Sequence, residues 1–93
     1  MFLIVSEIVT KCTEREEGVM VFKQCRKALK KAENIRVSFG GIGCVSEDFL
    51  YGFLGSVTEI SKESLKQIQY VRTENRVRTK IKGFYQKVGY KNC

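Results

Sequence analysis

The residues of this chain with the most reactive side chains are four cysteines. They lie at positions 12, 25, 44 and 93, which are 13, 19 and 49 residues apart, so none forms a C-x-x-C pair. The chain has no histidine, which removes the usual general base, the usual metal nitrogen and the usual partner of a cysteine nucleophile. The sequence therefore predicts that thiols such as Cys25 and Cys44 are small buried hydrophobic groups, with no metal, no cofactor and no enzymatic activity.

A glycine-rich segment, FGGIGCVS from Phe39 to Ser46, lies between a β-branched run and an amphipathic run. Such an order is typical of phosphate-binding turns, where backbone N–H groups reach a pyrophosphate. Here, however, Ser46 takes the place of the third glycine of the dinucleotide pattern, and no Lys-Ser/Thr pair follows as a Walker loop requires. We therefore interpret the segment as a turn from a strand into a helix.

Ser46 stands at the N-cap position of the helix that follows. Glu47 and Asp48 occupy the first turn, where the helix dipole favours acids. Apolar residues then recur at helical spacing from position 49 to position 57, which predicts a helix over residues 46–58.

The opposite face of this predicted helix carries two glycines between two acids. Asp48, Gly52, Gly55 and Glu59 recur at i, i+4, i+7 and i+11. A glycine inside a helix costs roughly 1 kcal/mol relative to alanine. Close approach of a partner, such as a second copy of the chain, would explain both glycines; neutral drift on a solvated face is the alternative.

The elements that position this segment follow from hydrophobic periodicity. Strands are predicted over residues 2–9, 35–39 and 67–71, and helices over about 19–32, over 46–58 and from about residue 74. Residues 10–18 are expected to form a loop that ends at Gly18, and residues 60–66 a polar connection. The order β-α-β-α-β-α with short connections predicts parallel strands and helical crossovers. The predicted fold is one small α/β domain over residues 1–93 with a single-layer sheet.

The positive charge gathers in the last quarter of the chain. Of the net +7, residues 70–93 carry +6, because they hold seven Lys or Arg against one acid, Glu74. Such a segment attracts nucleic acid, anionic lipid or an acidic protein, and charge alone does not choose among them. The predicted basic patch on the last helix consists of Arg76, Arg78, Lys80, Lys82 and Lys87.

The segment IRVSFGGIGCVSEDFLYGFLGSV, residues 35–57, resembles the STAS-like family, distant relatives of bacterial anti-sigma factor antagonists and of sulfate transporter cytoplasmic domains. Two departures stand out: Ser38 takes the place of the usual Asp, and Glu47 and Asp48 replace the other serines of a triplet. The resemblance implies a STAS-like fold and implies that Ser46 matches the serine that a partner kinase phosphorylates in the antagonists. An ordinary N-cap is the alternative. The matching positions are Phe39, Gly41, Ile42, Val45, Ser46, Phe49 and Gly55.

These observations predict a non-enzymatic regulatory domain that docks on a protein through residues 40–59. The partner would be a kinase-like or other regulatory protein, or a second copy of the chain. The predicted docking residues are Ser46, Glu47, Asp48, Gly52, Gly55 and Glu59.

Two alternatives stay open: a small basic nucleic-acid-binding protein that uses the C-terminal helix, and a phage-type inhibitor of a host complex. The longest apolar run, Phe2 to Val5, is too short to span a bilayer, and the N-terminus lacks the features of a signal peptide. A soluble cytoplasmic protein without a membrane partner is therefore expected.

Overall fold

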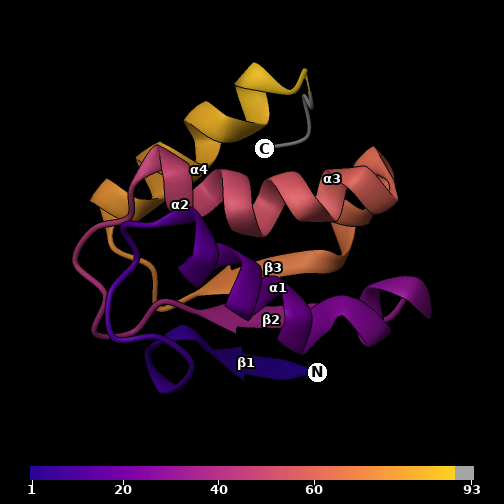
Figure 1. Cartoon of the computed structure of the whole chain (residues 1–93), viewed down its shortest axis with the longest axis horizontal. Coiled ribbons are helices and arrows are strands. Elements are labelled where there is room, and N and C mark those ends of the chain that lie inside the picture. The colour runs from indigo at the N-terminus through magenta and orange to yellow at the C-terminus, as the bar shows by residue number, and fades with distance from the viewer. Residues whose placement is uncertain (90–93) are drawn as a thin grey trace.

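The structure, a computed structural model, describes residues 1–89 as alternating strands and helices (Figure 1). The last four residues, which include Cys93, lie outside the described range. The order of the elements confirms the predicted β-α-β-α-β-α arrangement. The strands are Phe2–Ile4 (β1), Ile35–Ser38 (β2) and Ile68–Val71 (β3); the α-helices are Arg15–Lys30 (α1), Glu47–Leu50 (α2), Ser56–Ile60 (α3) and Asn75–Lys87 (α4); the other helical segments are the 3-10 helices Val5–Glu7 (η1) and Lys62–Gln67 (η3) and the π-helix Tyr51–Gly55 (η2).

The three strands form one parallel sheet in the order β1-β2-β3. In this sheet Leu3 lies opposite Val37, and Val37 lies opposite Tyr70. The parallel pairing confirms that the helices act as crossovers. When strands are added in sequence order through right-handed crossovers, successive helices lie on the same side of the sheet. The helices of this chain are therefore all expected on one face.

Figure 1 shows α1 in front of the sheet, with the helix from α2 to α3 beside it. The last helix is anchored on the same side, because Tyr85 of α4 packs its ring against Tyr70 of β3 and the two hydroxyls lie 2.9 Å apart. The core lies between the sheet and this helical layer. Its largest fully buried side chains are Phe39, Phe49, Phe53, Ile35, Leu50, Leu54 and Leu65, with valines at positions 5, 21, 37, 57 and 77.

Helix α1 packs directly on η2 through two glycines. A β-carbon at Gly18 would lie 2.1 Å from the carbonyl oxygen of Phe49, and one at Gly52 would lie 2.1 Å from the carbonyl oxygen of Arg15. Both distances are far inside van der Waals contact, so only glycine lets these two backbones approach so closely. The prediction that Gly18 ends a loop was therefore wrong: it is a buried residue of α1.

Helix α1 also begins earlier than its apolar stripe predicts. A capping box between Glu14 and Glu17 starts the helix at Arg15 rather than near residue 19. The two acids satisfy backbone N–H groups at the helix start, since the Glu17 carboxylate accepts hydrogen bonds from the N–H groups of Thr13 and Glu14 at 2.9 Å each. The same bonds lower the pKa of Glu17.

Two other boundaries differ from the prediction. The first strand ends at Ile4 because η1 turns the chain, and the turn lets both Val5 and Val9 bury their side chains. The connection expected to be polar is η3, in which Ser64 and Leu65 are buried. The central helix, predicted over 46–58, runs from Glu47 to Ile60 with its middle turn as the π-helix η2.

Candidate docking surface

Ser46 caps α2, as the sequence predicts. Its Oγ accepts a hydrogen bond from the N–H of Phe49 at 3.0 Å and donates one to the carbonyl of Thr13 at 2.6 Å. Its N–H donates to the carbonyl of Cys12 at 2.9 Å. Ser46 therefore holds the start of α2 and also ties it to the segment that leads into α1. A phosphate on this oxygen would replace the hydrogen bond to Thr13.

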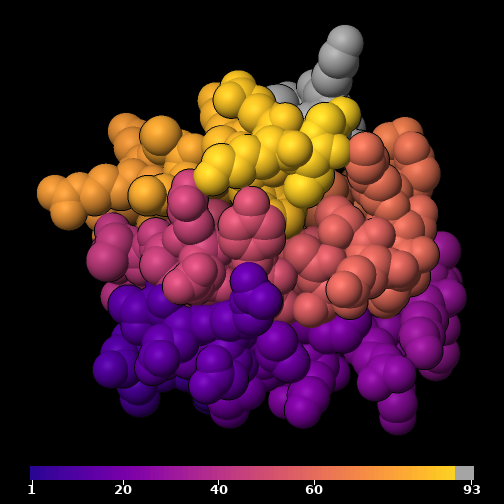
Figure 2. Space-filling model, turned by 45° about the horizontal axis from the view of Figure 1, so that its top comes forward, coloured from indigo at the N-terminus to yellow at the C-terminus, as the bar shows by residue number. Residues whose placement is uncertain are grey.

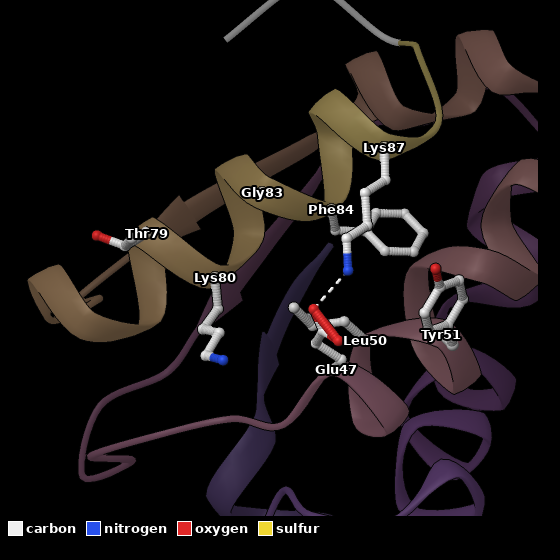
Figure 3. Close-up of a pocket in the computed structure, with 8 residues that line it drawn as sticks. All are labelled: Glu47, Leu50, Tyr51, Thr79, Lys80, Gly83, Phe84 and Lys87. Carbon is white, nitrogen blue, oxygen red and sulfur yellow. Dashed lines mark hydrogen bonds and ion pairs between the residues drawn. The ribbon is translucent and has the colours of Figure 1, made fainter.

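Glu47 forms an ion pair with α4. The Lys87 Nζ donates to the Glu47 Oε1 at 2.5 Å, and both side chains are exposed (Figure 3). This hydrogen bond and the lysine charge lower the pKa of Glu47, and the same bond raises the pKa of Lys87. Of the two acids predicted for docking at the helix start, one is thus already paired within the chain, while Asp48 is exposed.

The two predicted docking glycines have different environments. Gly52 is buried under α1 but also lines the larger of the two hollows described below, so its role in docking stays a prediction. The close backbone approach that the sequence indicates does exist, but α1 of the same chain makes it. Gly55 is half-buried, and a β-carbon there would make only ordinary contact with the Tyr51 ring, at 3.8 Å. Glu59 is exposed at the end of the same strip.

Tyr51, which the sequence analysis does not single out, separates two hollows on this surface. Its side chain is 41% exposed, and its ring packs edge to face on Phe84 of α4 with the centroids 5.4 Å apart. The larger hollow, of about 420 Å³, lies between α1, the η2–α3 segment and α4; it is lined by Arg15, Val19, Tyr51, Gly52, Gly55, Ser56, Thr58, Glu59, Phe84 and Val88. The smaller, of about 80 Å³, is lined by Glu47, Leu50, Tyr51, Thr79, Lys80, Gly83, Phe84 and Lys87.

The segments around these hollows lie side by side on one face of the molecule. Figure 2 shows α2 to α3, in pink to salmon, between α1 in indigo to purple and α4 in orange to yellow. In Figure 3 the side chains of Lys80 and Lys87 extend from α4 toward the segment that carries Glu47. We call the exposed area around Tyr51, with the two hollows that adjoin it, the Tyr51 surface.

Each hollow contains one glycine that no close contact within the described residues requires. Gly55 lines the larger hollow and Gly83 the smaller. No atom within 4 Å would meet a β-carbon at Gly83, and the contact at Gly55 is ordinary. Sequence reasoning missed Gly83 because it lies inside the basic helix, although a lone glycine in a helix interior is itself a signal.

The five residues of the predicted basic patch are all exposed on α4, but they lie on two flanks. Lys80 and Lys87 line the hollow against α2. Arg78 lies on the β3 side, where its Nε donates to the carbonyl of Thr73 at 3.2 Å. Lys82, four residues after Arg78, shares that flank. The patch is therefore split by the helix rather than continuous.

The cysteines differ from one another in exposure. Cys12 and Cys25 are buried, and burial raises the pKa of Cys12 to about 12 and that of Cys25 to about 11. Cys44 is exposed, because the segment that carries it lies at the surface, so the prediction that it is buried was wrong. Among residues 1–89 no three His, Cys, Asp or Glu side chains gather as metal ligands would.

No helix within the described range combines the length and the apolar character needed to cross a membrane. Comparisons of the chain with protein-family models, with curated proteins and with solved structures find no match. The three-stranded parallel α/β fold therefore rests on the structure itself, and the STAS-like assignment stays a prediction from the sequence.

Proposed function

We propose that this chain is a non-enzymatic regulatory interaction domain, STAS-like in kind, that docks on a protein partner through the Tyr51 surface. The docking region keeps the predicted range of residues 40–59 but has a different centre. Gly55 keeps the central place that the prediction assigned to both helix glycines, Tyr51 joins it there, and Gly83 of α4 completes the surface from the other side.

The observation that carries the proposal is the contrast between two pairs of helix glycines. Gly18 and Gly52 are required by the packing of α1 on η2, whereas Gly55 and Gly83 face open hollows on either side of Tyr51. Each of the second pair gives up roughly 1 kcal/mol of helix propensity with no compensating contact in the described chain. A partner that fills the hollows and encloses the tyrosine ring would supply that contact, and tyrosine is enriched at the centre of interfaces.

The π-helical turn supports the same location. Residues 51–55 widen the helix in its middle turn, where Ser56 Oγ donates to the carbonyl of Gly52 at 2.7 Å. Single π-helical turns inside α-helices occur frequently at functional sites. Here the turn contains both Tyr51 and Gly55, so it sets the position of the ring relative to the larger hollow.

Modification of Ser46 would regulate this surface through α1. A phosphate would add about two negative charges at the N-cap, next to Glu47 and in place of the hydrogen bond to Thr13. Because Arg15, two residues after Thr13, lines the larger hollow, release of this segment would change the wall of the docking surface. Mass spectrometry of protein from its native host tests this step, and the complete absence of phosphate at Ser46 under all growth conditions would remove it from the account.

Site-specific photo-cross-linking tests the docking surface. A benzophenone side chain in place of Tyr51 is expected to form a defined adduct with one protein partner, or with a second copy, in the native host. The same group in place of Met20, which is 48% exposed on α1, serves as the matched control. Equal adducts at both positions, or none at position 51, would contradict the proposal.

Nucleic-acid binding through α4 is the second candidate. It is favoured by one observation: Arg76, Lys80 and Lys82 are exposed, and among residues 1–89 none of them forms an ion pair. Retention on heparin or bulk DNA should then fall steeply between about 50 and 200 mM salt. Retention that is absent or insensitive to salt would leave the protein partner as the better account.

A further inference from the structure

The face of the sheet opposite the helices is open. Side chains alternate along a strand, so the outward positions are the neighbours of the buried ones. Phe2 on β1 is 56% exposed, and Arg36 on β2 and Gln69 on β3 are exposed. Parallel sheets are ordinarily covered on both faces, so this one has an unpartnered face. We call it the open face. Its outward positions are Phe2, Ile4, Arg36, Ser38, Gln69 and Val71, of which Phe2, Arg36 and Gln69 are exposed, Ile4 and Val71 are half-buried and Ser38 is buried.

Three different functional groups lie in one row across this face. Phe2 is in register with Arg36, and Arg36 with Gln69. With strands about 4.8 Å apart, the row places an aromatic ring, a guanidinium and a carboxamide at successive steps. The amino end of β1 is held in place, because the Arg36 N–H donates to the carbonyl of Met1 at 2.8 Å. The backbone that carries the phenyl ring is therefore fixed before any ligand arrives.

The charge on this face has a single sign. Of its six outward positions none is acidic, and Arg36 occupies the central strand. Arg72, at the carboxyl end of β3, is also exposed. An anionic ligand is the complement of such a surface.

Helix α4 lies on the other side of the sheet. Tyr85 contacts Tyr70, which points to the covered face, and Arg78 donates to the carbonyl of Thr73 at the start of its own helix. The exposed Lys82 follows Arg78 at helical spacing and shares its flank. The cations of α4 are therefore not part of the open face.

Size and charge argue against a second copy on the open face. Three strands of three or four residues cover only about 10 Å by 13 Å, whereas a stable protein interface buries about 800 Å² on each partner. A two-fold axis through the centre of the face would also bring two copies of Arg36 together. A narrow, flexible and anionic ligand satisfies both constraints.

We propose that the open face binds single-stranded nucleic acid, which runs across the strands along the row from Phe2 to Gln69. A base stacks on the Phe2 ring, as bases stack on sheet aromatics in other folds. Arg36 contacts a phosphate, and the Gln69 amide offers one donor group and one acceptor to a base edge. This site is distinct from the Tyr51 surface and from the α4 flank that carries Lys80.

Fluorescence anisotropy with labelled twelve-nucleotide probes, oligo-rU and oligo-dT, tests the proposal on the full chain at 50 mM salt. Phe2→Ala is expected to weaken binding about 5- to 150-fold, the range for a lost stacked base, while Phe2→Trp retains it. Arg36→Gln weakens binding and reduces its salt dependence. Both positions are exposed, so the variants are expected to keep the wild-type circular dichroism spectrum. Preference for one probe shows whether the site favours the RNA strand or the DNA strand.

Matched controls lie on the helical side. Met20→Ala removes an equally exposed apolar side chain, and Arg26→Gln removes an exposed arginine of α1; both are expected to stay within two-fold of wild type. Tyr51→Ala should also leave oligonucleotide binding unchanged, which separates this site from the docking surface.

Three results would overturn the proposal. One is the absence of binding to either probe at 50 mM salt. Another is a uniform loss in Arg36→Gln, Arg26→Gln and Lys80→Gln with no effect of Phe2→Ala, which would mean that net charge alone attracts the probe. The third is that Phe2→Ala leaves oligonucleotide binding unchanged but abolishes the protein adduct formed from position 51. The open face would then dock a protein.

Discussion

The two faces of the sheet are made by the same three strands but differ in almost every physical respect. The face under the helices carries Leu3, Val37 and Tyr70 in register, all within or against the core. The opposite face carries Phe2, Arg36 and Gln69 in register, all exposed. The covered face therefore contributes most of the stability of the fold, and the exposed side chains of the opposite face are available for binding.

The comparison also separates the two proposals. The Tyr51 surface belongs to the helical layer, where glycines and aromatic rings shape the hollows that we propose a protein fills. The open face is flat, small and basic, which suits a flexible anionic strand. Loss of one site should leave the other intact, and substitutions on the two sides should have different effects on stability.

The largest expected effect is a loss of stability at alkaline pH, which arises only on the covered side. Burial raises the pKa of Cys12 from 9.0 to about 12 and that of Cys25 to about 11, and it also raises the pKa of Tyr70. The unfolded chain releases these thiol protons near pH 9 while the folded chain keeps them, so stability is complete below pH 9 and falls as pH rises through 11 and 12. By pH 10.5 ionisation of the two thiols in the unfolded chain lowers the free energy of unfolding by about 4 kcal/mol.

Urea unfolding at pH 7.5 and pH 10.5, with a reductant present, measures this loss. Cys12→Ala is expected to be less stable at pH 7.5 but to lose less between the two pH values. A pH dependence that is the same in Cys12→Ala and in wild type would show that the thiol is not protected in the folded state.

The next effect distinguishes the two glycine pairs. Gly52→Ala or Gly18→Ala places a β-carbon 2.1 Å from a carbonyl oxygen of the facing segment, so each is expected to cost about 1–3 kcal/mol through overpacking. Gly55→Ala and Gly83→Ala meet no such obstacle and should stabilise the chain by up to about 1 kcal/mol. Thermal unfolding of the four variants gives the comparison. Stabilisation by Gly52→Ala would mean that α1 does not pack on η2 as described.

A smaller effect compares neighbours on β2 that point to opposite faces. Val37→Ala removes a fully buried side chain and should cost about 2 kcal/mol. Arg36→Ala removes an exposed one and should change stability by less than about 0.5 kcal/mol. Chemical denaturation of the pair checks both values. A comparable loss from Arg36→Ala would indicate that the open face is covered in the protein in solution.

The smallest expected effect concerns the exposed ion pair between Glu47 and Lys87. In Lys87→Gln the pKa of Glu47 should rise toward its ordinary value of 4.5, because the lysine hydrogen bond and charge that lower it are gone. The lowered pKa contributes stability above pH 4.5 that is lost as pH falls, and the variant lacks this contribution. Titration of the Glu47 carboxyl by NMR measures the change, and an unchanged pKa would exclude the ion pair in solution.

Much of the fold follows from the sequence because periodicity reports local burial. The apolar stripes of α1 and α4, the N-cap at Ser46 and the order of strands and helices all follow from it. The boundaries that failed depend on contacts distant in the chain. From the sequence Gly18 is typical of the end of a loop, and only the structure shows that it packs inside α1 against the segment that contains Gly52. Similarly, η1 ends β1 early so that the side chains of Val5 and Val9 reach the core.

The candidate site was harder to predict for the same reason. Sequence spacing identified Gly52 and Gly55 as equivalent, but only the tertiary structure shows that α1 covers one of them. The sequence pattern does not single out Tyr51, because one aromatic residue beside an apolar stripe is common in helices. The open face could not be predicted, since alternation in short strands does not show which side the helices will cover.

The central claim is that a partner fills the hollow beside Tyr51, and one measurement tests it most directly. Gly55→Leu adds a side chain toward the hollow of about 420 Å³, and its β-carbon makes only ordinary contact with the Tyr51 ring at 3.8 Å. The variant should therefore unfold at or above the wild-type temperature. With the photo-reactive group at position 51, the yield of the partner adduct should fall at least about ten-fold, the scale of a lost interface hot spot. An unchanged yield from a folded Gly55→Leu variant would contradict the account.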